Sequence, residues 1–568
     1  PDATKWDHTK WSPNYRNDNR IETHESGTAP CKTACPAHVA VQGYLKLAAQ
    51  DRYDEALALI KRENPLPAIC GRVCNRRCED ACTRGRVDEA VAIDEVKKFI
   101  AQRDLDAATR YVPPVVTPTR AGGFDQKIAI IGAGPAGLSC AFYLAEKGYK
   151  PVVFEKNERP GGMLTYGIPS FKLQKDVIEA EVEVIRLMGA EFRYGVEVGR
   201  DVTLDELRAQ GFKAFYVAIG CQGGRLAGIP GEDAEDVTVA VDFLREVNSG
   251  KIDALPGRTI VVGGGNVAID VARNACRLGS EHVEMFCLES EAQMPASEEE
   301  RREAIEDGAH ISCGWGPKEV HLDEAGHVRG ITFKRCTRVF DDEGRFAPEY
   351  DENDLRRVDA DRVVMSIGQS IVWGDLLAGS KVELGRGQGA LADPQTYQTA
   401  EPDIFVGGDV YTGPSFAIDA IAAGHEAAVS IHRFVQPGST LTIGRNQRRY
   451  TALDRDDVVI ESYDNASREV AHVDREREKA APFSEYVETF TEEQVRAETA
   501  RCLGCGASIV DPNKCIGCGL CTTKCAFDAI HLDRDRPECS TMVKYEQKLP
   551  SLGKYALKRA IKIKFGRK

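Results

Sequence analysis

The sequence predicts a multidomain fold. It has an α-helical, cysteine-rich N-terminal domain, two Rossmann-like α/β dinucleotide-binding domains with one inserted in the other, and a ferredoxin-like segment near the C-terminus. The α/β domains are predicted because a strand–glycine–helix pattern occurs at Gly132 and again at Gly263. The 19 cysteines are clustered, with six between Cys31 and Cys82 and six between Cys502 and Cys525. Such clusters in a long chain favour metal ligands over a disulfide scaffold.

Charge and composition narrow the class of protein. The net charge of −14 argues against general nucleic-acid binding, and the hydrophobic fraction of 42% is ordinary for globular domains. Residues 1–18 are polar and lack the apolar core of a signal peptide, and the longest apolar run is explained better by its glycine pattern than by a membrane span. We therefore predict a soluble, cytoplasmic protein.

Residues 1–28 are predicted to be an arm, and residues 29–103 a helical domain. Apolar residues recur at helical spacing over Val41–Ala49, Tyr53–Glu63 and Ile93–Ala101. Between these helices four cysteines repeat at four-residue spacing: Cys70, Cys74, Cys78 and Cys82. The nearby glycine and prolines favour a compact ligand-binding turn over one face of a helix. Thiolates in tight loops suit an iron–sulfur cluster, whereas zinc sites usually show CxxC pairs.

After a proline-containing linker, residues 104–126, comes the first glycine fingerprint. The apolar run Ile128–Ile131 predicts a buried strand that leads into three glycines at GxGxxG spacing, Gly132, Gly134 and Gly137. A helix and a second strand, Pro151–Phe154, follow and end at Glu155. The glycines allow close approach of a pyrophosphate, the helix N-terminus offers N–H groups, and Glu155 is placed to accept a ribose hydrogen bond.

A second fingerprint follows the strand Thr259–Val262, with small residues at Gly263, Gly265 and Ala268. Two such domains, one inserted in the other, are the architecture of two-dinucleotide flavoproteins. We therefore predict an NAD(P)-binding domain over residues 256–360, inserted in an FAD-binding domain made of residues 127–255 and 361–435. The chain is expected to return to the FAD-binding domain at Asp361–Gly368 and at Ile404–Asp409, where Asp409 is placed to bond the flavin's ribityl chain.

The C-terminal part combines a connector, ligands and a basic tail. Residues 436–490 are predicted to be a connector, and residues 491–540 an iron–sulfur segment in which a helix over Glu492–Arg501 precedes Cys502 and Cys505. The run Cys515, Cys518, Cys521 and Cys525 has ferredoxin-like 4Fe–4S spacing. The tail, residues 541–568, is basic with helical apolar spacing. It favours docking of another redox subunit, with a solvated tail and a membrane surface as alternatives.

The sequence has no cysteine pair at the position where disulfide reductases of this architecture carry one, and this affects the expected route of electrons from the flavin. Disulfide reductases of this architecture carry a cysteine pair soon after the glycine pair of the first domain. Here Gly161 and Gly162 are followed by Met163, Leu164 and Thr165, with no cysteine nearby. A flavin accepts a hydride and releases single electrons, so we expect electrons to leave through clusters rather than through a thiol relay.

Several strings resemble the small (beta) subunit of glutamate synthase and its relatives, the flavin end of dihydropyrimidine dehydrogenase and the large subunit of ferredoxin-dependent transhydrogenases. The matching strings are NPLPAICGRVCNRRCEDAC, GAGPAGL, RPGGMLTYGIP, GGGNVAID, MPAS and IFVGGDVYTGPSFAIDAIAAG. The resemblance spans roughly Ala29 to Phe434 and implies FAD in the first domain, NAD(P)H in the second and two N-terminal 4Fe–4S clusters. One departure is a missing CxxC pair before Cys31 and Cys35, which the later RCLGCG string resembles.

Fold and resemblance together give a set of predicted binding residues. Those for FAD are Gly132, Gly134, Pro135, Ala136, Gly137, Glu155, Lys156, Gly162, Met163, Leu164, Ala218, Ile219, Gly220, Gly408, Asp409, Ala417 and Ile418. Those for the nicotinamide nucleotide are Gly263, Gly264, Gly265, Asn266, Val267, Glu289 and Gly368. No side chain is predicted to act as an acid or nucleophile, since the flavin mediates hydride transfer.

Three 4Fe–4S clusters are predicted. By analogy one is held by Cys31, Cys82, Cys502 and Cys505, and a second by Cys35, Cys74 and Cys78 with Cys70 or a non-cysteine ligand. The third is held by Cys515, Cys518, Cys521 and Cys525. Cys505 and Cys525 are exchangeable in this scheme, because the fourth cysteine of such a run can serve a neighbouring cluster. The remaining seven cysteines are expected to be core residues: Cys140, Cys221, Cys276, Cys287, Cys313, Cys336 and Cys539.

The predicted function is that of a flavin/iron–sulfur oxidoreductase subunit that moves electrons between NAD(P)H, FAD and clusters toward ferredoxin or a partner redox subunit, with electron bifurcation as one form. The alternatives are a stand-alone NAD(P)H:ferredoxin reductase, a glutamate synthase small subunit, and a non-catalytic electron-wiring scaffold. NAD(H) is favoured over NADP(H), because Leu288 and Glu289 stand where NADPH-using relatives carry arginines. A solvated Glu289, or rescue of phosphate binding by Arg301 and Arg302, is the alternative.

Overall fold

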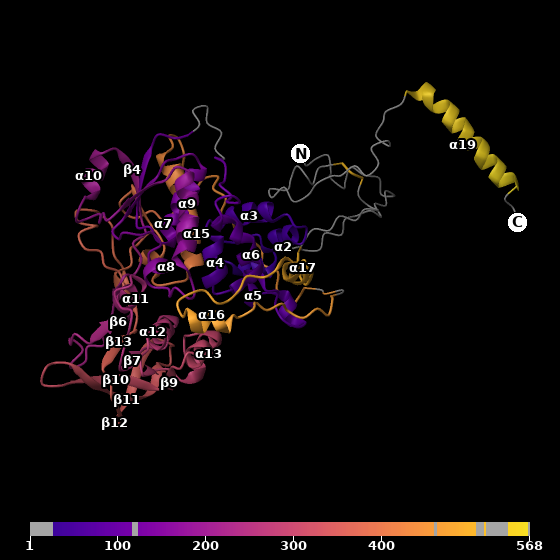
Figure 1. Ribbon diagram of the computed structural model, residues 1–568. Coiled ribbons are helices and arrows are strands. Elements are labelled where there is room, and N and C mark those ends of the chain that lie inside the picture. The colour runs from indigo at the N-terminus through magenta and orange to yellow at the C-terminus, as the bar shows by residue number, and fades with distance from the viewer. Residues whose placement is uncertain are drawn as a thin grey trace. The chain divides into compact units, whose positions relative to one another are not determined.

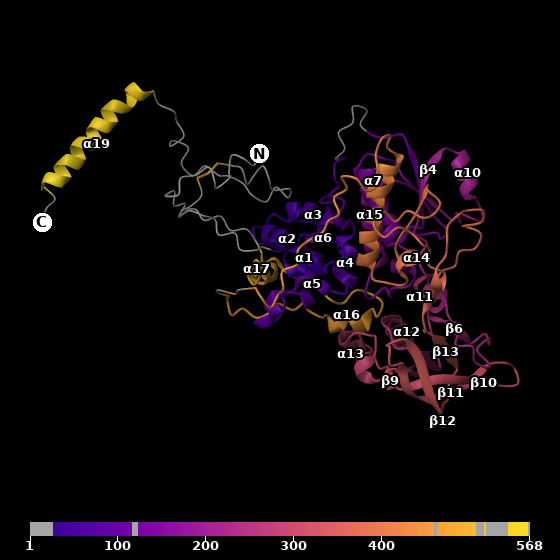
Figure 2. The same ribbon diagram turned by 180° about the vertical axis from the view of Figure 1, so that it is seen from behind.

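The computed structural model describes residues 27–115, 123–458, 460, 463–506, 516–518 and 544–565. The described residues from Gly27 to Gly506 belong to one compact unit, which is described first, and the described residues from 516 onward belong to a second. Figures 1 and 2 show the large unit as a group of short helices beside two parallel sheets. Among the described helices, none has the length and apolar character needed to cross a membrane.

The N-terminal domain consists of short helices, as the apolar spacing predicts. They are α1 (Pro30–Ala34), α2 (Val41–Ala48), α3 (Tyr53–Lys61), α4 (Pro67–Val73), α5 (Arg77–Asp80), the 3-10 turn η3 (Thr83–Arg86) and α6 (Ile93–Leu105). The four regularly spaced cysteines do not share one continuous helix. Arg76 adopts a left-handed conformation with a φ of 52°, which separates α4 from α5 and turns the chain there.

The first α/β domain is built on a five-stranded parallel sheet in the order β15-β4-β1-β2-β3. Its strands are β1 (Lys127–Ile131), β2 (Val152–Glu155), β3 (Glu191–Tyr194), β4 (Phe212–Val217) and β15 (Ile404–Val406). Its helices are α7 (Pro135–Glu146), α8 (Met163–Tyr166), α9 (Lys175–Leu187), α10 (Leu204–Ala209), α14 (Asp409–Thr412) and α15 (Ala417–Val435). The near-continuous apolar run of β1 is explained by burial on both faces of this sheet.

The second α/β domain has its own five-stranded parallel sheet in the order β6-β13-β7-β8-β9. Its strands are β6 (Val237–Val239), β7 (Arg258–Val262), β8 (His282–Cys287), β9 (His310–Cys313) and β13 (Arg362–Met365). Its helices are α11 (Ala240–Asn248), α12 (Asn266–Arg277), η4 (Glu291–Gln293) and α13 (Glu298–Glu306). An antiparallel sheet of β10 (Trp315–Leu322), β11 (Val328–Phe340) and β12 (Phe346–Val358) follows β9.

The structure corrects two expected domain boundaries. Asp361–Gly368 was assigned to the first domain, but β13 pairs in parallel with β6 and β7 of the second sheet. At the other boundary, β6 and α11 also precede the expected start of the second domain at residue 256. An apolar strand followed by glycine suits either sheet, because its pattern reports burial and not which neighbour it pairs with. The short ribbon of β5 (Gly223–Gly224) and β14 (Gln369–Ser370) lies where the chain passes between the domains.

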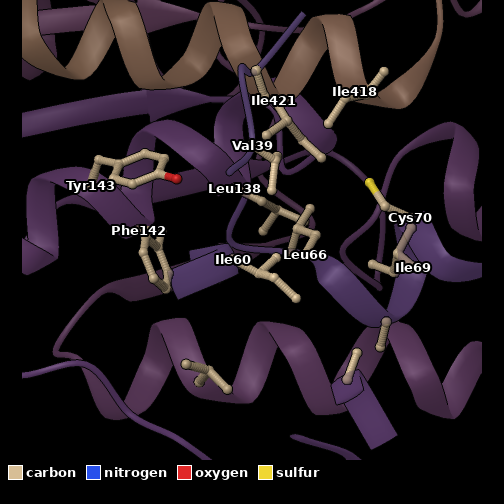
Figure 3. Close-up of a cluster of buried hydrophobic side chains, with 14 of the residues drawn as sticks. Val39, Ile60, Leu66, Ile69, Cys70, Leu138, Phe142, Tyr143, Ile418 and Ile421 are labelled. Atoms are coloured by element: carbon tan, nitrogen blue, oxygen red, sulfur yellow. The ribbon is translucent and has the colours of Figure 1, made fainter. Parts of the chain in front are cut away.

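The helical domain and the first α/β domain share one hydrophobic core. Figure 3 shows Ile60, Leu66 and Ile69 of the helical domain near Leu138 and Ile421 of the first α/β domain. Glu181 of α9 adds a buried polar link, because its carboxylate accepts hydrogen bonds from the backbone N–H groups of Ala68 and Ile69 at 2.7 and 3.0 Å. The cysteine-bearing α4 is therefore held directly against the first α/β domain.

The segment after α15 runs back over the other domains. Arg448 donates to the carbonyl of Ala37 at 2.9 Å, and Arg468 donates to that of Ala90 at 2.6 Å. Further on, α16 (Arg475–Ala480) lies beside α13 in both views, and Arg475 pairs with Glu306 at 3.1 Å. The segment thus ties the second α/β domain to the helical domain, and α17 (Glu492–Ala500) then leads to Cys502.

The second unit is described at residues 516–518 and 544–565. It contains α19 (Tyr545–Phe565), which includes Pro550 and whose described side chains are all exposed. Cys518 is also exposed, whereas Cys515, Cys521, Cys525 and Cys539 lie outside the described residues. The structure therefore describes only one ligand predicted for the third cluster.

Candidate functional site

A cavity opens at the carboxyl ends of β1, β2 and β4, where parallel α/β sheets bind ligands. Most of the residues predicted for FAD line it: Gly132, Gly134, Pro135, Ala136, Glu155, Lys156, Gly162, Met163, Leu164, Ala218, Ile219, Gly220, Gly408, Asp409 and Ala417. Gly137 and Ile418 do not. Gly137 packs inside the turn, and Ile418 is buried in the core, where Figure 3 shows it.

The first glycine turn has the geometry that close approach requires. A Cβ added at Gly137 would lie 1.9 Å from the carbonyl oxygen of Gly132, and one added at Gly132, where φ is 103°, would lie 2.5 Å from that of Ala218. Only glycine fits both positions. No side chain caps the N-terminus of α7, so its first N–H groups stay available for a phosphate. These features fit the pyrophosphate of a dinucleotide.

Two of the carboxylates that line the cavity, Glu155 and Asp409, lie in different environments. Glu155 is 2% exposed, and its carboxylate accepts hydrogen bonds from the N–H groups of Ala133 at 2.8 Å and Asn157 at 2.9 Å, so it also braces the glycine turn. Burial raises the pKa of Asp409 to about 6, opposed by hydrogen bonding from Ser415, whose N–H donates at 3.2 Å. Both groups can accept hydrogen bonds from hydroxyls of a bound ligand.

Other residues of the cavity wall were missed by the sequence reasoning. They include Val73, Val196, Val198, Val372, Trp373 and Leu376. No motif marks them, because the fold alone brings their separate segments to the cavity. Val73 is important because it belongs to the helical domain, lines the cavity and directly precedes the predicted cluster ligand Cys74. Val267 and Asp270 of α12 also line the cavity, so the second α/β domain closes part of it.

The second glycine turn leads from β7 to α12 through Gly263, Gly264 and Gly265, with Asn266 and Val267 opening the helix. A Cβ added at Gly264 would lie 3.1 Å from Oε2 of Glu289, so this carboxylate lies against the turn. Leu288 packs near Gly316, 2.9 Å from where a Cβ there would be. Gly368, where φ is 118°, lies beside Arg225, and Ser366, two residues before it, lies against Gly263, because a Cβ added at Gly263 would be 2.2 Å from the Ser366 carbonyl oxygen. The structure thus places Glu289 and the segment that leads to Gly368 beside the second glycine turn.

Four cysteines, which we call the first thiol group, line one small pocket: Cys31, Cys82, Cys502 and Cys505. Burial raises the pKa of Cys31 well above its usual value, and the thiols of Cys502, Cys82 and Cys505 add to the effect. Burial likewise raises the pKa of Cys502 to about 11. Such thiols bind a metal as thiolates, because a cation inverts the effect of burial. The all-sulfur donor set fits a 4Fe–4S cluster.

A second thiol group comprises Cys35, Cys70, Cys74 and Cys78. Burial raises the pKa values of Cys70, Cys74 and Cys78, and neighbouring thiols contribute to each, with Cys35 acting on Cys74. Cys70 is fully buried, and Figure 3 shows its sulfur pointing toward Ile418. Within the described part of the chain, no three His, Cys, Asp or Glu side chains are placed to hold a single metal ion.

Three family models match parts of this chain. Residues 126–424 match the family "Pyridine nucleotide-disulphide oxidoreductase". Residues 22–109 match "Dihydroprymidine dehydrogenase domain II, 4Fe-4S cluster", and residues 508–531 match "4Fe-4S binding domain". The last match covers the ferredoxin-like run that lies mostly outside the described residues, and it confirms that motif.

Three relatives show how far the similarity extends. The chain is 35% identical over 513 residues to the NADP(+)-dependent formate dehydrogenase subunit beta of Moorella thermoacetica, covering 84% of this chain and 70% of that protein. It is 35% identical to the glutamate synthase [NADPH] small chain of Escherichia coli, covering 72% and 89%. It is 32% identical to the NAD-dependent dihydropyrimidine dehydrogenase subunit PreT of Escherichia coli, covering 72% and 91%. The resemblance inferred from the motifs is confirmed.

Proposed function

The chain belongs to the pyridine nucleotide-disulphide oxidoreductase family, and we propose that it passes electrons between NAD(P)H, FAD and 4Fe–4S clusters toward ferredoxin or another redox subunit. When bound, the flavin exchanges a hydride with the nicotinamide and single electrons with the clusters. The chain's own residues bind and place these groups, and none is needed as an acid or nucleophile.

One observation carries this proposal. Val73 forms part of the wall of the flavin cavity, and the next residue, Cys74, belongs to the second thiol group. The cavity and a cluster site are thus adjacent in the fold. At the position where a disulfide relay would stand, Met163 and Leu164 line the cavity instead. A cluster site thus lies where it can take single electrons from the cavity. No cysteine at the position of Met163 and Leu164 can act as a thiol relay.

We propose three clusters. The first thiol group would hold one, and the second would hold another with Cys70 or a non-cysteine ligand as the fourth. The ferredoxin-like run would hold the third through Cys515, Cys518, Cys521 and Cys525, a proposal supported by its spacing and its family match. Exchange of Cys505 with Cys525 stays open in this scheme.

We also propose NAD(H) as the preferred coenzyme. Glu289 lies against the second glycine turn, where a carboxylate can accept a bond from a ribose 2′-OH but would repel a 2′-phosphate. Of the two arginines considered for phosphate rescue, Arg301 donates to the carbonyl of Glu291 at 2.7 Å while its buried Nε has no hydrogen-bond partner among the described residues, and the exposed Arg302 lies 3.9 Å from Glu306. The two relatives at 35% identity are named for NADP(H) and PreT at 32% identity for NAD, so the names of the relatives do not favour NAD(H), and the proposal rests on Glu289.

The proposed function predicts a two-stage response to NADH. Mixing the anaerobic holoprotein with NADH is expected to bleach the flavin absorbance first and then to generate the electron paramagnetic resonance signals of reduced clusters. The order follows because the nicotinamide meets the flavin and the clusters take over its single electrons. Stopped-flow absorbance and freeze-quenched resonance spectra measure both stages. Bleaching with clusters that stay oxidised would contradict the electron exit proposed here.

A redox partner with an acidic surface is the proposed ligand of the tail. Described cations on the exposed α19 include Lys548, Lys554, Lys558, Arg559 and Lys562, and apolar residues recur between them. The charge reversal Lys558→Glu with Arg559→Glu is expected to weaken binding of an acidic ferredoxin by about tenfold at low salt, with flavin reduction unchanged. The matched control is Lys558→Gln with Arg559→Gln. Equal electron transfer to ferredoxin by all three proteins would show that the tail is not a docking element.

A further inference from the structure

Two scattered cysteines meet at the end of the second sheet. Cys287 ends β8, Cys313 ends β9, and these two residues face each other in the parallel register of the strands. Their sulfur atoms are 3.7 Å apart. Neighbouring strands lie about 4.8 Å apart, which falls within the Cα separation of about 4.4–6.8 Å that a disulfide spans. The backbone is therefore already spaced for a bond between them.

One of these two cysteines, Cys287, lies against the second glycine turn. The Cβ of Cys287 is 2.8 Å from where a Cβ of Gly264 would lie, so its side chain packs directly under the turn. The thiol of Cys287 donates to the carbonyl of Glu289 at 3.7 Å, and the N–H of Gly314, next to Cys313, donates to the same carbonyl at 2.9 Å. A displacement of the Cys287 side chain would therefore act on Gly264 and on the carbonyl of Glu289.

We propose that Cys287 and Cys313 are a redox-modification site, which a peroxide converts to a disulfide and which thereby weakens binding of the nicotinamide nucleotide. The proposal rests on the function proposed above for the second glycine turn. Cys313 is partly exposed, whereas Cys287 is 2% exposed, so Cys313 is the thiol that an oxidant reaches. Burial, with the neighbouring Cys313, raises the pKa of Cys287.

Oxidation of the two thiols to a disulfide needs no reactant other than hydrogen peroxide. The Cys313 thiolate attacks one oxygen of hydrogen peroxide, which breaks the O–O bond, gives a sulfenic acid at Cys313 and releases one water once a proton is taken up. The Cys287 thiol then attacks the Cys313 sulfur, so that the S–S bond forms and the S–O bond breaks, and the thiol proton leaves with the departing hydroxyl as a second water. Two thiols lose two electrons and two protons, and one peroxide is reduced to two waters.

Formation of the disulfide must displace residues at the second glycine turn. The sulfurs have to approach from 3.7 Å to about 2.05 Å, which draws the Cys287 side chain toward β9 and away from its place under Gly264. The carbonyl of Glu289 also loses its thiol donor. Because a small displacement of a binding group costs affinity, we expect the NADH concentration for half-maximal flavin reduction to rise by about tenfold.

The test uses the full-length holoprotein with stoichiometric hydrogen peroxide. After alkylation of free thiols, peptide mass mapping is expected to find Cys287 joined to Cys313, and dithiothreitol is expected to reverse both the link and the change in NADH dependence. Cys313→Ser should prevent both the link and the change in NADH dependence, and Cys287→Ser is the second test variant. Cys276→Ser on α12 is the matched control, which should retain the link and the change. Absence of the 287–313 link, or a link that leaves NADH dependence unchanged, would overturn the proposal.

Different results would contradict the proposed function and the proposed redox site. If the reduced protein did not oxidise NADH, the proposed function would fail, yet the mass map would still report whether the disulfide forms. If reduced wild-type protein oxidised NADH normally but peroxide left its NADH dependence unchanged, only the redox-site proposal would fail.

Discussion

Replacing Cys502 and Cys505 by serine is expected to remove about four iron atoms per chain and to lower NADH-driven electron transfer to an external acceptor by at least about 100-fold. The reduction of the flavin by NADH should persist. The reason is the shared pocket, in which these two cysteines meet Cys31 and Cys82. Losing two of four ligands costs more than the roughly 10–100-fold that loss of a ligand's hydrogen-bonding partner costs.

The variant should keep its fold, because the segment is anchored by other bonds. Arg501 is 1% exposed and pairs with Glu498 at 2.6 Å and Asp88 at 3.0 Å. Gln42 also donates to the backbone carbonyl of Cys505 at 2.5 Å, a bond that a serine retains. Loss of iron would then report ligation and not unfolding.

Iron analysis, flavin content and an acceptor assay measure the effect. Cys276→Ser is the matched control, since Cys276 lies on α12, outside both thiol groups. Wild-type iron content in the double serine variant would show that Cys31 and Cys82 find their partners elsewhere. If iron fell but electron transfer remained, this cluster would lie off the electron path.

The double variant Leu288→Arg with Glu289→Arg is expected to move coenzyme preference toward NADPH by about tenfold or more. In the wild type, the Glu289 carboxylate lies against Gly264 of the second glycine turn, where we propose that the nucleotide ribose binds. Repulsion between this carboxylate and a 2′-phosphate costs on the order of 1 kcal/mol or more, which corresponds to roughly tenfold in affinity. Two arginines would replace that repulsion with charge-assisted hydrogen bonds.

Stopped-flow flavin reduction with NADH and NADPH measures the change. Glu289→Gln separates removal of the repulsion from the gain of new bonds, and it should give only part of the shift. Glu291→Arg is the matched control, because this acid is nearby but exposed. Faster and tighter reduction of the wild type by NADPH would overturn the NAD(H) proposal.

Local sequence patterns were sufficient to predict much of the architecture. The two glycine turns occur where the spacing predicts them, and α2, α3 and α6 begin at the expected residues, because periodicity and turn chemistry act over a few residues. The strand Arg362–Met365 was also recognisable as a strand. Its assignment to the first domain was wrong, since pairing with β6 and β7 depends on residues far away in the chain.

Cofactor types, the family and the glycine turns follow from residue order alone, because each depends on short-range chemistry in one segment. The placing of Val73 in the flavin cavity, the meeting of Cys31 with Cys502, and the contact of Cys287 with Cys313 follow only from the folded chain. The analogy with relatives anticipated the second of these, but the 3.7 Å approach of two scattered cysteines had no sequence signal. Long-range contacts of this kind are decided by which buried faces pack together, and many sequences with the same local pattern satisfy that packing differently.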